Sequence, residues 1–368
     1  MRTMQIITRV NRGGTARWLD VLISGLESRG NESALLAGLV QGAEIEDEIF
    51  NKHSGIHISG LGRSIAFSGD LRSVVEIRRA IKKYRPDLVN THTSKAGALG
   101  RIATIGLGDA RPAVVHTFHG HLLYGYFGRF KSGLITTAER ILSRVTDLYI
   151  SSGSIVRNEL IAAGISEPTK YVVVKPGIRD LELDSKEFVK KQFGIDSNSV
   201  VIGWLGRMAS IKRPDRVIEI AHQFPEVIFL VAGDGELLLS LKENAPSNVI
   251  FAGWSTPEII WAASDIALLT SENEAQPISL VESGYAGLPN VAFGVGSVSE
   301  VIEHGVTGFV GKTIEEVSAF LLQLIDSPTL REELGKNART KMIAEFSVDS
   351  FITGHIAAYE KAIANTIR

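Results

Sequence analysis

The segment VVIGWLGR, residues 200–207, has the form of a buried strand that ends in a glycine turn. Apolar runs of about four to eight residues bounded by Gly are expected of parallel strands whose two faces are both covered. The same form recurs along the chain, in MQIITRV, ESALLAG, LVNTHTS, AVVHTFH, DLYISSG, YVVVKPG, VIFLVAGDG, VIFAGW, IALLTS and LPNVAF. Helical patterns alternate with these runs, so the sequence predicts the α/β class with doubly wound parallel sheets.

One of the helical patterns is LRSVVEIRRAIKKY, residues 71–84. Its spacing predicts a single apolar face, formed by Leu71, Val74, Val75 and Ile81.

The alternation of strands and helices occurs twice, on either side of a charged segment with Pro and Gly at residues 175–188. A chain of 368 residues is also longer than the roughly 250–300 residues at which single cores stop growing. We therefore expect Rossmann-like domains at 1–178 and 179–349, with a last helix at 350–368 that packs back on the first. Because ligands bind at the carboxyl ends of such strands, the two domains are expected to face a central cleft.

The composition, 44% hydrophobic and 22% charged, is that of an ordinary soluble globular protein. The chain has no Cys, which excludes disulfides and thiolate metal sites. No apolar run approaches the roughly 18–20 residues of a membrane-spanning helix, so a cytoplasmic location is expected. Residues 1–178 hold 23 Lys+Arg against 15 Asp+Glu, and the remainder holds 16 against 26. The basic half predicts an anionic partner, either a phosphorylated substrate or an anionic membrane face. Nucleic acid is not expected, because no recognition motif is present.

The stretch SENEAQPISLVESGYAGLP, residues 271–289, places Glu274 and Glu282 eight positions apart across a Pro. This layout can set one carboxylate beside a sugar and the other beside a ribose. The alternative is that both acids lie on solvated helix faces, which is the usual place of Glu.

Arg207 and Lys212 lie in GWLGRMASIKRPD, directly after a strand and around the start of a helix. Two cations beside a helix N-terminus suit a diphosphate, since Arg presents a planar fork and Lys a point charge. Gly233 and Gly235, in VAGDGE, form a second turn after a strand that suits a nucleotide.

Two segments of the first half suit an anion less specifically. Gly13 and Gly14 follow the first strand, where the backbone can approach a ligand at a helix N-terminus; a plain tight turn explains them equally well. Lys95, in THTSKAGALGR, also follows an apolar strand, and it is either a phosphate contact or one more surface lysine.

Three histidines, His116, His119 and His121, lie in VVHTFHGHLLYGYFG. A metal site is not favoured, because no carboxylate or cysteine accompanies them. His119, just before Gly120, is interpreted as a substrate contact at a strand end, with a satisfied core histidine as the alternative. The following aromatic and basic segment predicts a membrane interface or an acceptor groove, or else a packed loop.

Taken together, these motifs resemble the retaining GT-B glycosyltransferases of family 4, which move a sugar from a nucleotide diphosphate. The resemblance covers nearly the whole chain and is strongest from residue 202 to 310. It implies that the reacting groups are contacted by His119, Glu274, Arg207 and Lys212. The donor would be bound by Gly13, Gly14, Arg207, Lys212, Gly233, Gly235, Glu274, Ala275, Gln276, Pro277, Ile278 and Glu282. The acceptor would be bound by Lys95, Tyr124, Tyr126 and Arg129.

Within this pattern, Glu274 would hold sugar hydroxyls, Glu282 the ribose, and the N–H groups of Ala275 to Ile278 would face the sugar. No metal and no other cofactor is required, since Arg207 and Lys212 compensate the diphosphate. Two positions depart from the pattern: Ala275 stands where Gly is usual, and Ser297 replaces the second Gly of a later Gly-Gly turn.

The predicted activity is transfer of a hexosyl or N-acetylhexosaminyl group, with a UDP-sugar as the expected donor. The acceptor is expected to be a lipid-linked or growing surface glycan of bacterial polysaccharide assembly, with peripheral contact to the anionic inner membrane. Two alternatives remain: a nucleotide-sugar epimerase on the same scaffold, and a protein that binds a nucleotide-sugar without turning it over.

Overall fold

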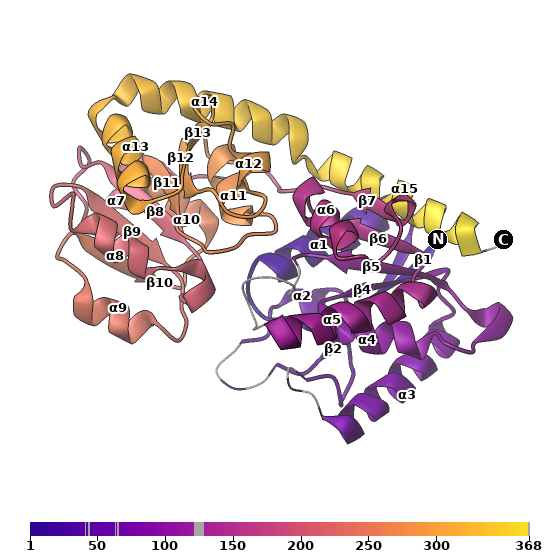
Figure 1. Ribbon diagram of the computed structural model, residues 1–368. Helices are drawn as coiled ribbons and strands as arrows, with labels where there is room; N and C mark the ends of the chain where they lie inside the picture. Colours follow the sequence, from indigo (N-terminus) through magenta and orange to yellow (C-terminus); the bar gives the residue numbers. More distant parts are fainter. Residues whose placement is uncertain (41, 43–44, 63, 65, 121–128, 367–368) are drawn as a thin grey trace. The chain divides into compact units, whose positions relative to one another are not determined.

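The computed structural model describes residues 1–40, 42, 45–62, 64, 66–120 and 129–366, which form two compact units (Figure 1). The first unit consists of Met1–Gly177 and Val348–Arg368, and the second of Ile178–Ser347. These bounds lie one or two residues before the boundaries expected from the sequence.

The first unit contains a seven-stranded sheet in the order β3-β2-β1-β4-β5-β6-β7. All its neighbouring strands are parallel. Its strands are β1 (Arg2–Arg9), β2 (Glu32–Gly38), β3 (Ile56–His57), β4 (Leu88–His92), β5 (Ala113–Phe118), β6 (Leu148–Ser151) and β7 (Tyr171–Val173). Its helices are α1 (Gly14–Ser28), α2 (Ile49–Lys52), α3 (Phe67–Tyr84), α4 (Ser94–Ala103), α5 (Arg129–Leu142), α6 (Ser154–Ala162) and α15 (Val348–Thr366).

The second unit repeats the arrangement with six parallel strands in the order β10-β9-β8-β11-β12-β13. Its strands are β8 (Val201–Leu205), β9 (Ile228–Ala232), β10 (Val249–Gly253), β11 (Ile266–Leu269), β12 (Asn290–Phe293) and β13 (Gly308–Gly311). Its helices are α7 (Lys186–Gln192), α8 (Asp215–Ala221), α9 (Leu238–Asn244), α10 (Pro257–Ala263), α11 (Ile278–Tyr285), α12 (Val298–Val301), α13 (Ile314–Asp326) and α14 (Pro328–Glu345).

Both sheets are covered on both faces. In β8, Val201 packs into one hydrophobic cluster, whereas Ile202 and Trp204 pack into the cluster on the opposite face. In β1, Met4 and Ile7 likewise belong to different clusters. Alternate residues of a strand point to opposite faces, so burial of both sets produces the continuous apolar runs seen in the sequence. The predicted α/β class and the two doubly wound sheets are therefore confirmed.

The predicted apolar face of α3 is right in part. As predicted, Ile81 is buried and Val74 packs against the same cluster, but Leu71 is 60% exposed and Val75 39% exposed, and Ser73 and Ile77 are buried instead. A Cβ added to Gly60 would lie 2.0 Å from the Gly69 carbonyl oxygen, so the first turn of α3 lies directly on this loop. The same Cβ would lie 2.7 Å from Ser73 Oγ, so this contact is on the buried side of the helix.

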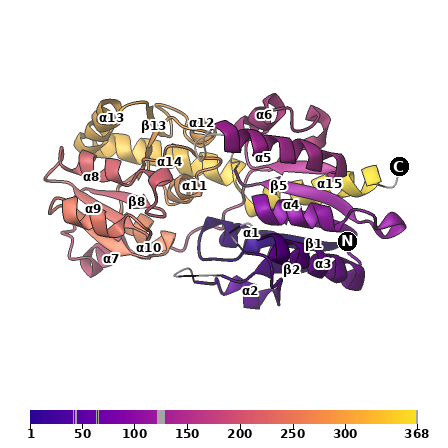
Figure 2. The ribbon, with the colours of Figure 1, turned by 60° about the horizontal axis from the view of Figure 1, so that its bottom comes forward.

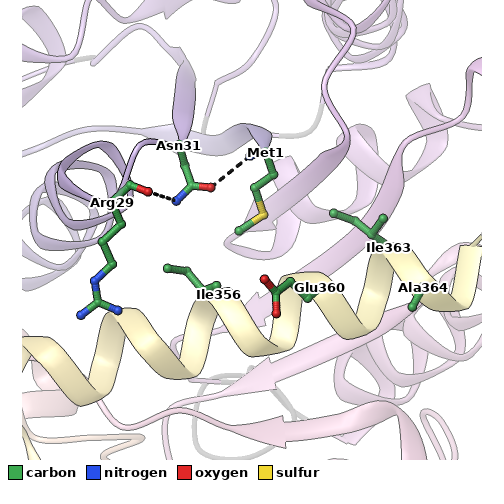
Figure 3. Close-up of a pocket in the computed structure, with 7 residues that line it drawn as sticks. All are labelled: Met1, Arg29, Asn31, Ile356, Glu360, Ile363 and Ala364. Atoms are coloured by element: carbon green, nitrogen blue, oxygen red, sulfur yellow. Dashed lines mark hydrogen bonds between the residues drawn. The ribbon is translucent and has the colours of Figure 1, made fainter.

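Helix α15 belongs to the first unit although it follows the second in sequence. It packs against α1 and β5, and Figures 1 and 2 both show it lying along this unit. Phe351, Ile352, Ala358 and Tyr359 join the cluster that covers one face of the sheet. Beside the helix, a shallow pocket lies between its outer side and the start of β1, where Asn31 accepts a hydrogen bond from the Met1 amino group (Figure 3). Of the predicted site residues that the structure describes, none lines this pocket.

None of the helices in the described ranges combines the length and the apolar character needed to cross a bilayer.

Buried histidines should make the first unit sensitive to acid. His355, on α15, is completely buried, and burial lowers its pKa to about 4. The unfolded chain takes up this proton near pH 6.5, so between pH 6.5 and 4 the unfolded state binds more protons and stability falls as the pH falls. Between pH 7.5 and pH 5, the free energy of unfolding should fall by about 2 kcal/mol more in the wild type than in His355→Leu.

Urea unfolding of the first unit, followed by circular dichroism at both pH values, measures this difference. His222→Gln, at an exposed position of the second unit, is the control. An unchanged pH dependence in His355→Leu would contradict the assignment of the acid sensitivity to this residue.

Candidate active site

The strand order of the second unit reverses between β8 and β11, which are neighbours in the sheet. Such a switch point leaves an open crevice at the carboxyl ends of the two strands. Arg207 follows β8 by two residues and Glu274 follows β11 by five. The topology therefore brings two of the predicted site segments to the same place.

The Glu274 carboxylate is the centre of this region. The residue is only 7% exposed, and its Oε1 accepts hydrogen bonds from Lys212 Nζ at 2.5 Å and from Ser271 Oγ at 2.6 Å. A buried carboxylate is costly unless it is paired and hydrogen-bonded, and here it is both. The structure thus joins two residues that the sequence predicted to act on one substrate.

A set of hydrogen bonds holds Lys212 in this position. Lys212 ends a short 3₁₀ turn (Ser210–Lys212), and its carbonyl accepts a hydrogen bond from the Thr270 hydroxyl at 3.0 Å. Trp204 Nε1 donates to the same hydroxyl at 2.9 Å. The sequence analysis did not single out Trp204, Thr270 or Ser271. Only Ser271 carried a signal, since it lies three residues before Glu274.

The glycine turn after β9 packs on the turn after β8. A Cβ on Gly233 would lie 1.9 Å from the Gly206 carbonyl oxygen, and one on Gly235 would lie 2.5 Å from that of Met208. Both glycines also have positive φ angles, of 134° and 154°. Glycine is therefore required here for close backbone approach as well as for conformation.

Arg207 belongs to the turn after β8, between Gly206 and Met208 in sequence, and is exposed. Its guanidinium makes no ion pair or hydrogen bond with any residue in the described ranges, in contrast to Lys212. This region therefore contains one cation, Lys212, that is paired with Glu274, and a second, Arg207, whose charge is not paired with any described residue.

The loop from Ala275 to Ile278 contains polar groups without partners. Pro277 has no N–H, so three backbone donors remain, on Ala275, Gln276 and Ile278. None of the three makes a hydrogen bond to another residue of the described part of the chain. The side-chain amide of Gln276 is also buried, and neither its Oε1 nor its Nε2 has a partner there. A buried side chain that lacks both its donor and its acceptor partners is uncommon, and that of Gln276 lies two residues after Glu274.

Two further residues complete the description of this unit. Glu282 lies in α11 and is buried, at 5% exposure. Gly296, with φ +47°, lies against Glu274: an added Cβ would be 1.8 Å from the Glu274 carbonyl oxygen. The next residue, Ser297, donates its N–H to that oxygen at 2.9 Å. The Ser that departs from the Gly-Gly pattern is therefore compatible with this contact.

In the first unit, Gly13 and Gly14 lie at the exposed N-terminus of α1, and no side chain caps the helix. Lys95 is paired with Asp70 at 2.6 Å and also donates to the Ser64 carbonyl. Its charge is therefore compensated within the protein. Tyr124 and Tyr126 lie outside the described residues, as does the side chain of Arg129.

His119 lies just after β5 and is half-buried. Its ring contacts the Trp18 ring edge to face at 4.4 Å, and its Nε2 lies 3.0 Å from Nδ1 of His92. Burial lowers the pKa of His119 to about 4, with a smaller contribution from the nearby His355. The ring is therefore neutral at physiological pH and can hydrogen-bond without carrying charge.

No cluster of three or more His, Asp or Glu side chains suited to a metal ion occurs within the described ranges.

Comparison with known families agrees with this geometry. Residues 12–180 match the family described as Glycosyltransferase Family 4, and residues 185–341 match Glycosyl transferases group 1. The chain is a family 4 glycosyltransferase. Its two Rossmann-like units are those of the GT-B fold.

Two relatives align with most of this glycosyltransferase. UDP-Gal:alpha-D-GlcNAc-diphosphoundecaprenol alpha-1,3-galactosyltransferase of Escherichia coli is 28% identical, over 78% of this chain and 79% of its own length. The capsular polysaccharide biosynthesis glycosyltransferase CapM of Staphylococcus aureus is 24% identical, over 79% and 81%. Among solved structures, Anabaena HepE in complex with UDP and glucose is 21% identical, with a TM-score of 0.82 over 98% of this chain and 99% of that one.

The unpaired amide of Gln276 gives the glycosyltransferase a predictable stability defect. A buried polar group without a partner costs about 1–3 kcal/mol, so Gln276→Leu should raise the free energy of unfolding by about 1 kcal/mol. Asn290→Leu is the matched control, because this buried amide donates to the Leu280 carbonyl and accepts from the Ser283 hydroxyl. Denaturant unfolding without ligand measures both. Equal destabilisation by the two substitutions would show that Gln276 is satisfied in solution.

Proposed function

We propose that this glycosyltransferase transfers a hexosyl group from a UDP-sugar, with retention at the anomeric carbon, to a lipid-linked or growing glycan in bacterial polysaccharide assembly. The names of the relatives support the donor and the acceptor class. The galactosyltransferase of Escherichia coli uses UDP-Gal and an undecaprenol-linked acceptor, and CapM acts in capsular polysaccharide biosynthesis. The observation that carries the proposal is the paired Lys212 and Glu274 beside a loop of unpaired hydrogen-bond donors.

In the proposed complex, the sugar and the diphosphate replace contacts that the protein makes with itself. Glu274 accepts hydrogen bonds from sugar hydroxyls, and the N–H groups of Ala275, Gln276 and Ile278 donate to sugar oxygens. Lys212 transfers its contact from Glu274 to the diphosphate, where Arg207 adds the second positive charge. Glu282 binds the ribose.

The remaining donor contacts come from backbone. Gly233 and Gly235 would contribute their backbone to the nucleotide site, in the turn that packs on the Gly206 turn. The free N–H groups at Gly13 and Gly14 would contribute to the diphosphate, and His119 would contact the transferred sugar.

Charge redistribution explains how these groups would accelerate transfer. As the bond between the anomeric carbon and the diphosphate breaks, negative charge grows on the leaving group. Fixed cations aimed at that group stabilise the transition state more than the ground state. Arg207 and Lys212 can do this without a metal ion.

Retention is proposed to proceed by attack on the same face that the diphosphate leaves. The acceptor hydroxyl oxygen bonds to the anomeric carbon, the bond from that carbon to the phosphate oxygen breaks, and the hydroxyl proton passes to the departing phosphate. This route needs no enzymatic nucleophile. Retaining glycosidases instead use two carboxylates about 5–5.5 Å apart.

The first test concerns the roles of Glu274 and Lys212 in the proposed donor site. Glu274→Ala and Lys212→Ala should each lower transfer at least ~10²-fold, the range found when one electrostatic contact to a transition state is lost. Acceptor-dependent release of UDP, measured in EDTA, is the readout, and circular dichroism checks the fold. Lys312→Ala, an exposed position of the same unit, is the control. Normal turnover in both site variants would refute the assignment, and loss of UDP-sugar without an acceptor would favour an epimerase.

Access to a lipid-linked acceptor is proposed to involve α5. Phe130, Leu134 and Ile141 are 80%, 57% and 58% exposed, and their spacing puts them on one side of this helix. A buried pair, Arg101 Nη1 and Glu139 Oε2 at 2.8 Å, ties α5 to α4, so the apolar stripe is held on the surface. An exposed apolar stripe on a unit with excess Lys and Arg suits the surface of an anionic membrane.

A vesicle assay tests the membrane contact. The double variant Phe130→Ser with Leu134→Ser should reduce flotation with phosphatidylglycerol vesicles at least ~10-fold, since burying each side chain contributes roughly 1.5–3 kcal/mol. Leu239→Ser, at a position 77% exposed on α9, is the matched control. Equal flotation of the wild type and the double variant would exclude α5 as the contact.

A further inference from the structure

A hydrogen-bonded chain of three side chains runs from the interior of the first unit to His119. Gln5, in β1, is completely buried, and its Oε1 lies 3.0 Å from Nε2 of His92 at the end of β4. Nδ1 of His92 lies 3.0 Å from Nε2 of His119, just after β5. The three strands β1, β4 and β5 are consecutive in the sheet, and each positions one of these side chains.

The Gln5 amide determines which atoms donate and which accept in the hydrogen bonds from Gln5 through His92 to His119. The amide nitrogen of Gln5 donates to the Thr3 hydroxyl at 3.3 Å, which leaves the amide oxygen facing His92. An amide oxygen can only accept, so His92 must carry its proton on Nε2. His92 is neutral, because complete burial holds its pKa well below the ordinary value. Its Nδ1 is therefore a bare acceptor.

The same reasoning then applies to His119. Since Nδ1 of His92 accepts, Nε2 of His119 must donate and carry the proton. In a neutral ring the other nitrogen, Nδ1, is bare. No residue of the described ranges makes a hydrogen bond to this nitrogen.

We propose that Gln5, acting through His92, holds His119 in the Nε2–H tautomer, so that His119 offers substrate a hydrogen-bond acceptor. Gln5 and His92 are positioning residues in this arrangement. The identity of the substrate group rests on the proposed function: the group beside His119 is a hydroxyl of the transferred sugar, which donates to Nδ1. A sugar that presents a carboxylate there is disfavoured, because two acceptors meet.

The packing around His119 supports a fixed ring. Trp18 contacts the rings of both His119 and His92 edge to face, at centroid distances of 4.4 and 5.3 Å. A ring flip would break the hydrogen bond to His92 within this aromatic packing. The tautomer and the orientation are therefore set together.

The tautomer can be measured without any assay of activity. In protein labelled with 15N-histidine, two-bond 15N–1H correlations at neutral pH distinguish the protonated ring nitrogen from the bare one, and His119→Gln assigns the signal. We expect His119 of the wild type to be protonated on Nε2 and bare on Nδ1. An Nδ1–H form in the wild type would overturn the proposal, whatever the enzyme transfers.

Variants test whether Gln5 is the cause. Gln5→Met has a similar shape but no acceptor oxygen, and it should allow the Nδ1–H form of His119 to appear. Thr117→Val is the matched control. The buried Thr117 hydroxyl donates to Asn90 Oδ1 and takes no part in the hydrogen bonds that join Gln5, His92 and His119, so its loss should leave the tautomer of His119 unchanged. An unchanged tautomer in folded Gln5→Met would refute the role of Gln5, and if that variant does not fold, the wild-type measurement still decides.

Binding separates this proposal from a general structural role. Gln5→Met should weaken a UDP-sugar roughly five- to tenfold, the effect of losing one hydrogen bond, while UDP alone, which lacks the sugar, binds as to the wild type. Equal loss for both ligands would contradict the specific contact. If neither ligand binds the wild type, the proposed donor fails, but the tautomer measurement still tests the hydrogen-bonded chain.

Discussion

The loops after β8, β11 and β12 meet at the buried carboxylate residue Glu274, and their arrangement depends on satisfying it. Lys212 and Ser271 hydrogen-bond it, and Gly296 lies against its backbone. Removing Lys212 or Ser271 would leave the Glu274 charge buried without a partner, which is costly. Further hydrogen bonds hold these partners in place. The hydrogen bonds from Trp204 to Thr270, and from Thr270 to the Lys212 carbonyl, belong to this support. Beside the satisfied carboxylate lie the unsatisfied groups of Gln276 and its neighbours, and the proposed donor site rests on this contrast.

The sheet of the first unit also contains buried polar side chains that need hydrogen-bond partners. Gln5, Asn90, His92 and Thr117 are polar side chains buried within the strands of this sheet. They hydrogen-bond in two pairs, Gln5 with His92 and Thr117 with Asn90, and Asn90 also donates to the Tyr359 hydroxyl at 2.8 Å. Tyr359 belongs to α15, the last helix of the chain. This helix therefore completes both the apolar cover of the sheet and its polar interior.

The sequence predicted the strands well where two covered faces produce continuous apolar runs, as in β2, whose bounds agree with the run ESALLAG. It missed β3 and β13, which are two and four residues long and carry too little pattern to be seen. It also placed Leu71 and Val75 on the buried face of α3, although Val74 and Ile81 do pack there. Leu71 and Val75 fit a helical period, but the close approach of Gly60 to Gly69 and Ser73 is not visible in local periodicity.

The sequence by itself determined the α/β class, the repetition of the sheet and the identity of the acids, cations and glycines that follow the strands. These features depend on residues close together in the chain, so their spacing is sufficient to reveal them. Only the tertiary structure decided that Lys212 pairs with Glu274, 62 positions away, and that His119 meets His92 and, through it, Gln5. Such contacts arise because parallel strands distant in sequence end at the same edge of a sheet. Their hydrogen-bond directions follow from which donors and acceptors meet there.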